Sequence, residues 1–393
     1  MDIFKKCFDF KEAEEVQAKG IYPYFTPIDE VYGNKVKIKG KEYIMIGSNN
    51  YLGLVGDERI NRAMKEAIDK YGSGTCGSRF LNGTLSMYVE FEEELAEFME
   101  KEAALIFSTG YQTNLGIISA LGTKNDALII DRLDHASLID ATRLSFSKVY
   151  KFKHNDMDDL ERILKTIPDD MGKLIVVDGV YSMDGDIAPL DKMVEIKKKY
   201  GARLFVDDAH GVGVLGEKGR GAAEHYDVLK EVDIIMCTFS KSFASLGGFV
   251  AGDKKVIEYI KHFGRPMIFS ASITPAAAAA AKEALKIIKT EPERRKRLQE
   301  IANYMKSEFT KMGYNTGNTE TAIIPVIIGD DEKTFKLWLA LRELGIFVTP
   351  VISPAVSPDN SRIRTSYTAT HSDEELEAVL KAFYQAGKML NLI

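Results

Sequence analysis

The stretch "KLIVVDGVYSMDGDIAPLDKMVEIKKKYGARLFVDDAH", residues 173–210, contains a strand, a helix and a second strand in succession. The two short apolar runs, KLIVV and ARLFV, have the pattern of strands that are covered on both faces. The segment between them, LDKMVEIKKKYG, has helical character and ends at a glycine. A strand, a helix and a strand in this order predict a unit in which the two strands are parallel.

The same alternation continues on both sides of this unit. Earlier strands are predicted at "ALIF", "ALII" and "KVYKF", and later ones at "DIIMC" and "GFVAG", with helical segments among them. This order predicts an α/β fold with a mostly parallel sheet. We expect a large domain at 50–280, preceded by an N-terminal segment at 1–49 and followed by a smaller α+β domain at 281–393.

Composition narrows the functional class. The chain has 393 residues, 28% charged residues and a net charge of −6, which argues against a general nucleic-acid binder. Its three cysteines form no pattern typical of disulfides or zinc, so no metal site is expected and a reducing cytoplasm is the natural setting. The N-terminus has no apolar core of a signal peptide, and no stretch approaches the length of a membrane span.

Polar side chains follow two of the predicted strands. Asp207, Asp208 and His210 come directly after "ARLFV", and Lys241 follows "DIIMC" in a loop of small residues. In open α/β sheets, ligands bind outside the carboxyl ends of the strands, so these groups can face one cavity. A lysine that loses hydration there becomes a neutral nucleophile. The pair of an aspartate and a lysine suits pyridoxal phosphate, where the lysine forms a Schiff base and the aspartate keeps the pyridine nitrogen protonated.

Two further segments fit that interpretation. In "LIFSTGYQTNLGIISAL" a strand ends at a turn and a helix begins, which provides free N–H groups for a phosphate. His135, in "DRLDHASLID", follows another strand, where its imidazole can lie flat on a cofactor ring. By contrast, "GVGVLG" at 211–216 matches the dinucleotide motif G-x-G-x-x-G without a helix directly after it, so NAD binding is not expected.

Together these stretches resemble the α-oxoamine synthases, a family of fold-type I pyridoxal-phosphate enzymes. The resemblance runs from "SNNYLGL" (48–54) to "SRIRTSYTAT" (361–370). It includes the motifs GSRFLNGT, FSTGYQTN, DHASLID, KFKHND, GVYSMDGDIAPL, VDDAHGVGVLGEKGRG, TFSKSFASLGG and FSASITP. The resemblance implies a sheet of the seven-stranded type and a smaller C-terminal domain.

The resemblance also implies a role for individual residues. Lys241 corresponds to the Schiff-base lysine, Asp207 to the partner of the pyridine nitrogen, His210 to the histidine near the ring hydroxyl and His135 to the stacking histidine. The remaining cofactor contacts implied by the family are Gly110, Tyr111, Ser182, Thr238, Ser240 and, from the partner subunit of a homodimer, Ser270. Arg364 corresponds to the arginine that binds the amino-acid carboxylate, for which a guanidinium fork is well suited. Asn50 corresponds to a residue near the substrate.

The family reaction is a decarboxylative Claisen condensation of an amino acid with an acyl-CoA. The resemblance therefore implies that this protein is an acyltransferase. "RFLNGTL", "TFSKSFASLGGFVAGD" and "RPMIFSASITPA" are most similar to the bacterial serine palmitoyltransferase branch, which condenses L-serine with palmitoyl-CoA to 3-ketodihydrosphingosine in sphingolipid biosynthesis. The glycine C-acetyltransferase and 8-amino-7-oxononanoate synthase branches are the alternatives. A silent regulatory subunit on the same fold is a non-enzyme alternative, but such subunits typically lack the lysine that is present here as Lys241.

Overall fold

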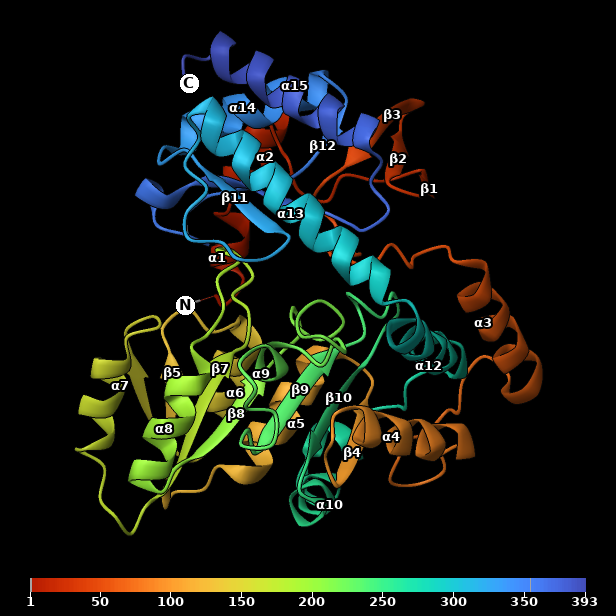
Figure 1. Cartoon of the computed structure of the whole chain (residues 1–393), viewed down its shortest axis with the longest axis vertical. Helices are drawn as coiled ribbons and strands as arrows, with labels where there is room; N and C mark the ends of the chain where they lie inside the picture. Colours follow the sequence, from red (N-terminus) through yellow and green to blue (C-terminus); the bar gives the residue numbers. More distant parts are fainter. Residues whose placement is uncertain (1, 354) are drawn as a thin grey trace.

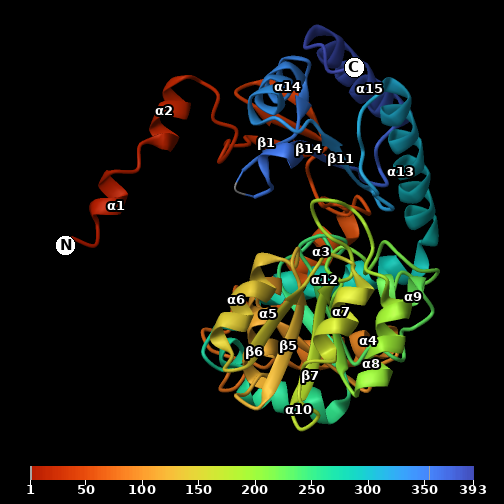
Figure 2. The same cartoon turned by 90° about the vertical axis from the view of Figure 1, so that its left-hand side faces the viewer.

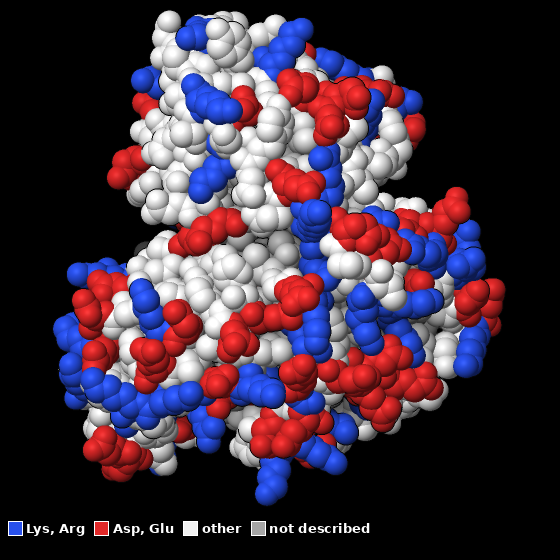
Figure 3. Space-filling model, in the orientation of Figure 1, with Lys and Arg blue, Asp and Glu red and all other residues white. Residues whose placement is uncertain are grey.

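The computed structural model describes residues 2–353 and 355–393 of the chain. Figure 1 shows two bodies: a larger one built around a long twisted sheet, and a smaller one that contains the C-terminal helices. Helix α13 (Pro292–Met312) runs from the boundary between them along the smaller body. Acidic and basic side chains are mixed over the face seen in Figure 3.

The large sheet has seven strands in the order β4-β10-β9-β8-β7-β5-β6. Its strands are β4 (Ala103–Phe107), β5 (Asp126–Asp131), β6 (Lys148–Phe152), β7 (Gly172–Asp178), β8 (Arg203–Asp207), β9 (Ile234–Thr238) and β10 (Gly248–Gly252). All neighbours are parallel except β10, which is antiparallel to both β4 and β9. The expected mostly parallel sheet is therefore confirmed.

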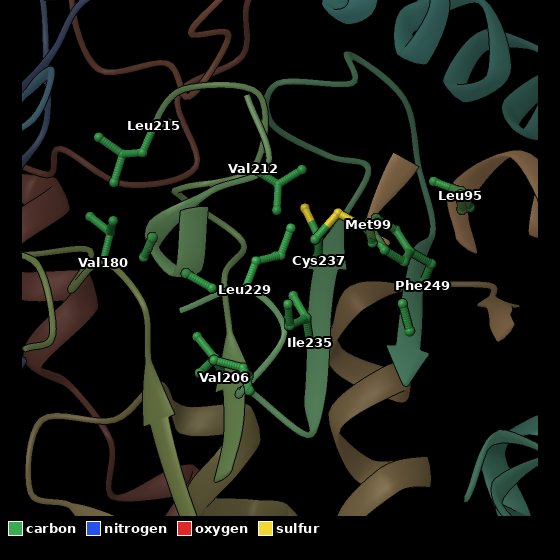
Figure 4. Packing of buried hydrophobic residues seen from close by; sticks show 14 of the residues in the cluster. Leu95, Met99, Val180, Val206, Val212, Leu215, Leu229, Ile235, Cys237 and Phe249 are labelled. Atoms are coloured by element: carbon green, nitrogen blue, oxygen red, sulfur yellow. The ribbon is translucent and has the colours of Figure 1, made fainter. Parts of the chain in front are cut away.

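Both faces of this sheet are covered, which explains why its strands are continuous apolar runs. Along β7, Ile175 and Val177 belong to one buried cluster and Val176 to another, because successive side chains of a strand point to opposite faces. Figure 4 shows part of the first cluster, with Val206 and Ile235 on the central strands. The helices of the large body, of which α3 packs on α12 rather than on the sheet, are α3 (Glu58–Tyr71), α4 (Ser86–Phe98), α5 (Gly110–Leu121), α6 (Ala136–Leu144), α7 (Met157–Leu164), α8 (Leu190–Tyr200), α9 (Ala222–His225), α10 (Lys254–Phe263), α11 (Arg265–Ile268) and α12 (Pro275–Thr290).

The smaller body contains a three-stranded antiparallel sheet in the order β11-β14-β13, with β11 (Ile323–Ile327), β13 (Pro350–Val351) and β14 (Arg362–Ser366). Helices α13, α14 (Asp331–Glu343) and α15 (Asp373–Met389) pack around it, and a 3₁₀ turn, η1, spans Pro358–Asn360. A reciprocal capping box formed by Ser372 and Glu375 begins α15.

The N-terminal part of the chain belongs with the smaller body in space. Strands β1 (Glu30–Tyr32), β2 (Lys35–Ile38) and β3 (Lys41–Met45) form a second sheet with β12 (Ile346–Phe347), which is parallel to β3. The preceding helices, α1 (Lys5–Phe8) and α2 (Glu12–Ala18), bury none of their residues and project away from both bodies (Figure 2). Within 2–353 and 355–393, no helix combines the length and apolar character that a membrane crossing requires.

Candidate active site

A cavity of about 270 Å³ lies where the central strands of the large sheet end. Asp178 is the last residue of β7, Asp207 of β8 and Thr238 of β9, and all three line this cavity. Gly110 at the start of α5 and His135 before α6 complete the wall. The site therefore lies outside the carboxyl ends of parallel strands, as predicted for ligands of such sheets.

Lys241 and His210 meet inside this cavity. The Nζ atom of Lys241 lies 2.6 Å from Nε2 of His210, whose Nδ1 lies 2.6 Å from the hydroxyl of the buried Tyr51. Burial lowers the pKa of Lys241 to about 8, although Asp207 and Asp178 act in the opposite direction. Burial and the neighbouring Lys241 also hold the pKa of His210 well below its ordinary value, so the imidazole is neutral. The lysine is thus close to the pH range in which it can act as a nucleophile or a base.

Asp207 is held by a network that the sequence did not reveal. Its Oδ2 accepts a hydrogen bond of 2.6 Å from the Nδ2 of Asn114, which also donates to the hydroxyl of Ser137 over 2.8 Å. Its Oδ1 accepts the backbone N–H of Ala209 at 3.1 Å. The carboxylate is 4% exposed, so these bonds fix the orientation of a charge that faces the cavity.

His135 is fixed at the start of α6. Its backbone N–H donates to Asp178 over 2.8 Å, and its Nδ1 accepts the backbone N–H of Ser137 at 3.2 Å, which leaves Nε2 as the protonated nitrogen of the neutral ring. Burial lowers the pKa of His135, with Lys241 acting in the same direction and Asp207 against it. A neutral imidazole at the cavity wall is suited to lie against a planar ring.

Asp208, adjacent to Asp207, has a different function. Its Oδ2 accepts the backbone N–H of Ala222 at 2.7 Å, and a side chain at Gly211 or Gly221 would meet its carboxylate at 2.0 and 1.8 Å. Burial raises the pKa of Asp208 to about 7. Asp208 therefore stabilises the glycine-rich loop 211–221. In this loop, turns follow β8 before the short helix α9 begins, so "GVGVLG" lacks the helix directly after the glycines that a dinucleotide motif requires.

Small and hydroxyl-bearing residues gather at the start of α5. Thr109 caps the helix by accepting the N–H of Gln112, and Gly110 packs so closely on Thr238 that a Cβ would lie 2.7 Å from its side chain. The hydroxyls of Thr238 and Ser240 are 2.9 Å apart. A helix N-terminus with adjacent hydroxyls suits a phosphate group.

Arg364 approaches from the smaller body. On β14, its Nε donates to the carbonyl oxygen of Ser182 at 2.6 Å and its Nη2 to Oδ1 of Asn49 at 2.9 Å. Asn50, which the resemblance places near the substrate, accepts the backbone N–H groups of Leu54 and Val55. The side-chain contact to the arginine therefore comes from Asn49.

Nine of the predicted residues line this same cavity. They are Gly110, Tyr111, His135, Ser182, Asp207, His210, Thr238, Ser240 and Lys241. Ser270 is not part of the lining, and its hydroxyl accepts a hydrogen bond of 3.2 Å from the side chain of Gln112. Asn50 and Arg364 belong to the adjoining boundary between the two bodies. The sequence did not identify Asn49, Tyr51, Asn114, Ser137 or Asp178, although Tyr51 is adjacent to a predicted residue and Ser137 lies two positions after one.

The residues present fit pyridoxal phosphate. The cavity combines a lysine, a carboxylate fixed by Asn114, a neutral histidine and a phosphate-type helix start. One buried side-chain oxygen of the cavity lining, Oδ1 of Asn114, has no hydrogen-bond partner among the described residues. Unpartnered polar atoms at a cavity of this kind indicate a ligand with polar groups of its own.

Comparison with known proteins agrees with this geometry. Residues 41–383 match the model of the family "Aminotransferase class I and II". The chain is 50% identical over 381 residues to a serine palmitoyltransferase of Sphingobacterium spiritivorum, with 96% of each chain covered. It is 43% identical over 384 residues to an 8-amino-7-oxononanoate synthase of Thermoanaerobacter pseudethanolicus, covering 98% of this chain and 97% of the other.

Among solved structures, a lysine-to-alanine variant of serine palmitoyltransferase from S. paucimobilis with a bound PLP–myriocin aldimine superposes with a TM-score of 0.97. The two are 36% identical, and each chain is covered completely.

The chain belongs to the aminotransferase class I and II family. Within that class it is an α-oxoamine synthase, most similar to the bacterial serine palmitoyltransferases, as the sequence motifs predicted.

Proposed function

We propose that this protein is a pyridoxal-phosphate-dependent acyltransferase that condenses L-serine with palmitoyl-CoA, releasing coenzyme A and carbon dioxide. The observation that supports this most strongly is the pairing of Lys241 with a neutral His210 in a cavity that also contains the fixed carboxylate of Asp207. Similarity to serine palmitoyltransferases over nearly the whole chain supports the choice of substrates. The product of this condensation, 3-ketodihydrosphingosine, places the enzyme in sphingolipid biosynthesis.

The residues of the site can each be given a task. When bound, pyridoxal phosphate supplies an electron sink that stabilises negative charge at the α-carbon of an amino acid. Asp207, oriented by Asn114, would hold a proton on the pyridine nitrogen, and His135 would lie against the ring. His210 would donate a hydrogen bond to the ring hydroxyl. Gly110, Tyr111, Thr238, Ser240 and a partner subunit's Ser270 would bind the phosphate.

Lys241 has two tasks in this proposal. It holds the cofactor before the substrate arrives, and once its amine is free it moves the proton at the α-carbon. A pKa near 8 favours the second task, because the free amine is then partly neutral at ordinary pH. Arg364 would bind the carboxylate of the amino acid through guanidinium donors that are not used by Ser182 and Asn49. Asn50 would lie near the substrate.

The proposal extends to the assembly, the location and the domain division of the protein. We propose a homodimer with the site at the subunit interface, a cytoplasmic location and the division of the chain at about residues 50 and 280. The proposed interface agrees with the exposed apolar side chains of Phe80, Leu246 and Phe269. Phe269 precedes Ser270, which is proposed to act across that interface.

The alternative reaction is that of an 8-amino-7-oxononanoate synthase, supported by the relative that is 43% identical. A test of the reaction type uses L-serine labelled at the carboxyl carbon. We expect labelled carbon dioxide and coenzyme A in equal amounts, formed only when palmitoyl-CoA is present. Release of coenzyme A without labelled carbon dioxide would exclude a decarboxylative condensation of serine.

A further inference from the structure

His154 lies outside the cavity, in the motif "KFKHND" that the proposed mechanism does not use. Its Nδ1 is 3.1 and 3.2 Å from the two carboxylate oxygens of Asp131, and its Nε2 is 2.8 Å from Oδ2 of Asp186. Both ring nitrogens face carboxylates, which only accept hydrogen bonds, so both must carry a proton. Burial alone lowers the pKa of His154, but the bonds to Asp131 and Asp186 outweigh it and raise that pKa to about 10. The side chain is therefore an imidazolium at neutral pH.

The two carboxylates come from different parts of the large body. Asp131 is the last residue of β5 and is fully buried, whereas Asp186 ends the loop 181–186 that follows β7. Asn155 connects the same two carboxylates: its backbone N–H donates to Asp131 and its Nδ2 donates to Asp186, both at 2.9 Å. Asn155 has a φ of +50°, a conformation that is uncommon outside glycine. His154 and Asn155 thus attach the loop 181–186 to the end of β5.

Two arginines of β14 in the smaller body also bind the loop 181–186. The carbonyl oxygen of Ser182 accepts the Nε of Arg364 at 2.6 Å. The carbonyl oxygen of Met183 and the carboxylate of Asp184 accept Nη1 of Arg362 at 3.0 and 2.6 Å. The orientation of Arg364 therefore depends on where this loop lies.

Little free space remains for the loop to shift on its own. At Gly185, which has a φ of +73°, a Cβ would lie 2.3 Å from the carbonyl oxygen of Ile323. The carbonyl oxygen of Gly185 accepts the backbone N–H of Glu320 at 3.0 Å. The loop is thus packed between His154 and the smaller body, and a change at Asp186 is transmitted to Ser182 through a short, closely packed segment.

We propose that His154 is a positioning residue for substrate binding: by holding Asp186 against Asp131, it places the loop 181–186 so that Ser182 orients Arg364 toward the carboxylate of the amino acid. His154 contacts neither cofactor nor substrate. This inference rests on the proposed role of Arg364. Loss of the imidazolium leaves two buried or half-buried carboxylates facing each other, and their repulsion displaces the loop.

The test compares L-serine with 2-aminoethanol, which is serine without its carboxylate. Binding of each to the cofactor-loaded enzyme is measured by the change in visible absorbance of the cofactor, for wild type, His154→Leu, His154→Gln, Arg364→Ala and the double variant His154→Leu/Arg364→Ala. His225→Gln is the matched control, because His225 is exposed on the short helix α9. Thermal unfolding of the cofactor-free proteins shows which variants remain folded.

We expect His154→Leu to reduce the preference for L-serine over 2-aminoethanol by about ten-fold, a coupling typical of residues in one hydrogen-bonded network. His154→Gln, which retains a donor without the charge, should lose less, and the double variant should lose no more preference than Arg364→Ala alone. If His154→Leu does not fold, the same comparison is made with His154→Gln, for which a preference reduced at least three-fold is expected on the same basis.

Two results would overturn the inference while leaving the proposed function intact. One is a reduced preference in Arg364→Ala together with an unchanged preference in the His154 variants. The other is equal weakening of both ligands by the His154 variants, which would indicate general loosening of the site. An unchanged preference in Arg364→Ala would instead refute the role of Arg364 itself.

Discussion

The amine of Lys241 lies 2.6 Å from Nε2 of His210, deep in a cavity that also contains the carboxylate of Asp207. Burial lowers the pKa of the lysine to about 8, which raises the fraction of neutral, nucleophilic amine at ordinary pH.

Lys241→Ala should abolish the covalent attachment of the cofactor, and with it the absorbance band of that bond, as well as all condensation activity, because no other amine lines the cavity among the described residues. The fold should persist, since the substitution removes a buried charge from a preformed site. Absorbance spectra, activity and thermal unfolding of the purified variant check these points together. Normal turnover in the variant would show that the nucleophile has been misassigned.

The reactivity of Lys241 in the cofactor-free protein should follow its lowered pKa. The neutral amine, which is the reactive form, accumulates as pH rises through about 8 rather than through the ordinary value of 10.5. The rate at which the cofactor-free protein recombines with pyridoxal phosphate, measured from pH 6 to 11, should therefore rise with a midpoint near 8. A midpoint above 10 would contradict the desolvated environment of the lysine.

Asp207→Asn should reduce turnover far more than cofactor binding. A neutral amide cannot keep the pyridine nitrogen protonated, so the electron sink weakens, and we expect a loss of at least about 100-fold in kcat. Asn114→Ala is the matched variant, because it leaves the charge of Asp207 in place and removes only the bond that orients it. A loss of merely two- or three-fold in Asp207→Asn would argue against the assigned role.

Arg364→Ala should raise the KM for the amino acid much more than the KM for the acyl-CoA. A charge-assisted pair with a carboxylate contributes roughly 1.5–3 kcal/mol, which corresponds to about a ten- to hundred-fold change. Steady-state kinetics with each substrate varied in turn provide the measurement. A change confined to the acyl-CoA would place the arginine in the other substrate pocket.

The sequence predicted those features that depend on local pattern. Short apolar runs identified the strands, and the positions of Asp207 and Lys241 directly after two of them predicted that both residues face one cavity, which they line. Asn114 could not be found in this way, because its partner Asp207 lies 93 positions later and their contact exists only after α5 packs beside the sheet. The same holds for the pairing of β3 with β12, which joins segments about 300 residues apart.

Adjacent residues were also difficult to distinguish by pattern alone. Asn49, Asn50 and Tyr51 are consecutive, yet they contact Arg364, the backbone of Leu54 and His210 respectively. Asp207 faces the cavity, whereas the neighbouring Asp208 faces the glycine-rich loop. Which of two neighbours points into a site is decided by the exact backbone path at a strand end, which no periodicity specifies.

The choice of substrates is tested by comparing kcat/KM for L-serine with palmitoyl-CoA against kcat/KM for glycine with acetyl-CoA on the same preparation. Each buried methylene stabilises binding by about 0.8 kcal/mol, so an acyl site that accepts a long chain should favour palmitoyl-CoA by several orders of magnitude. We predict a clear preference for serine with palmitoyl-CoA. A higher kcat/KM for glycine with acetyl-CoA would contradict the account and assign the protein to the glycine C-acetyltransferase branch.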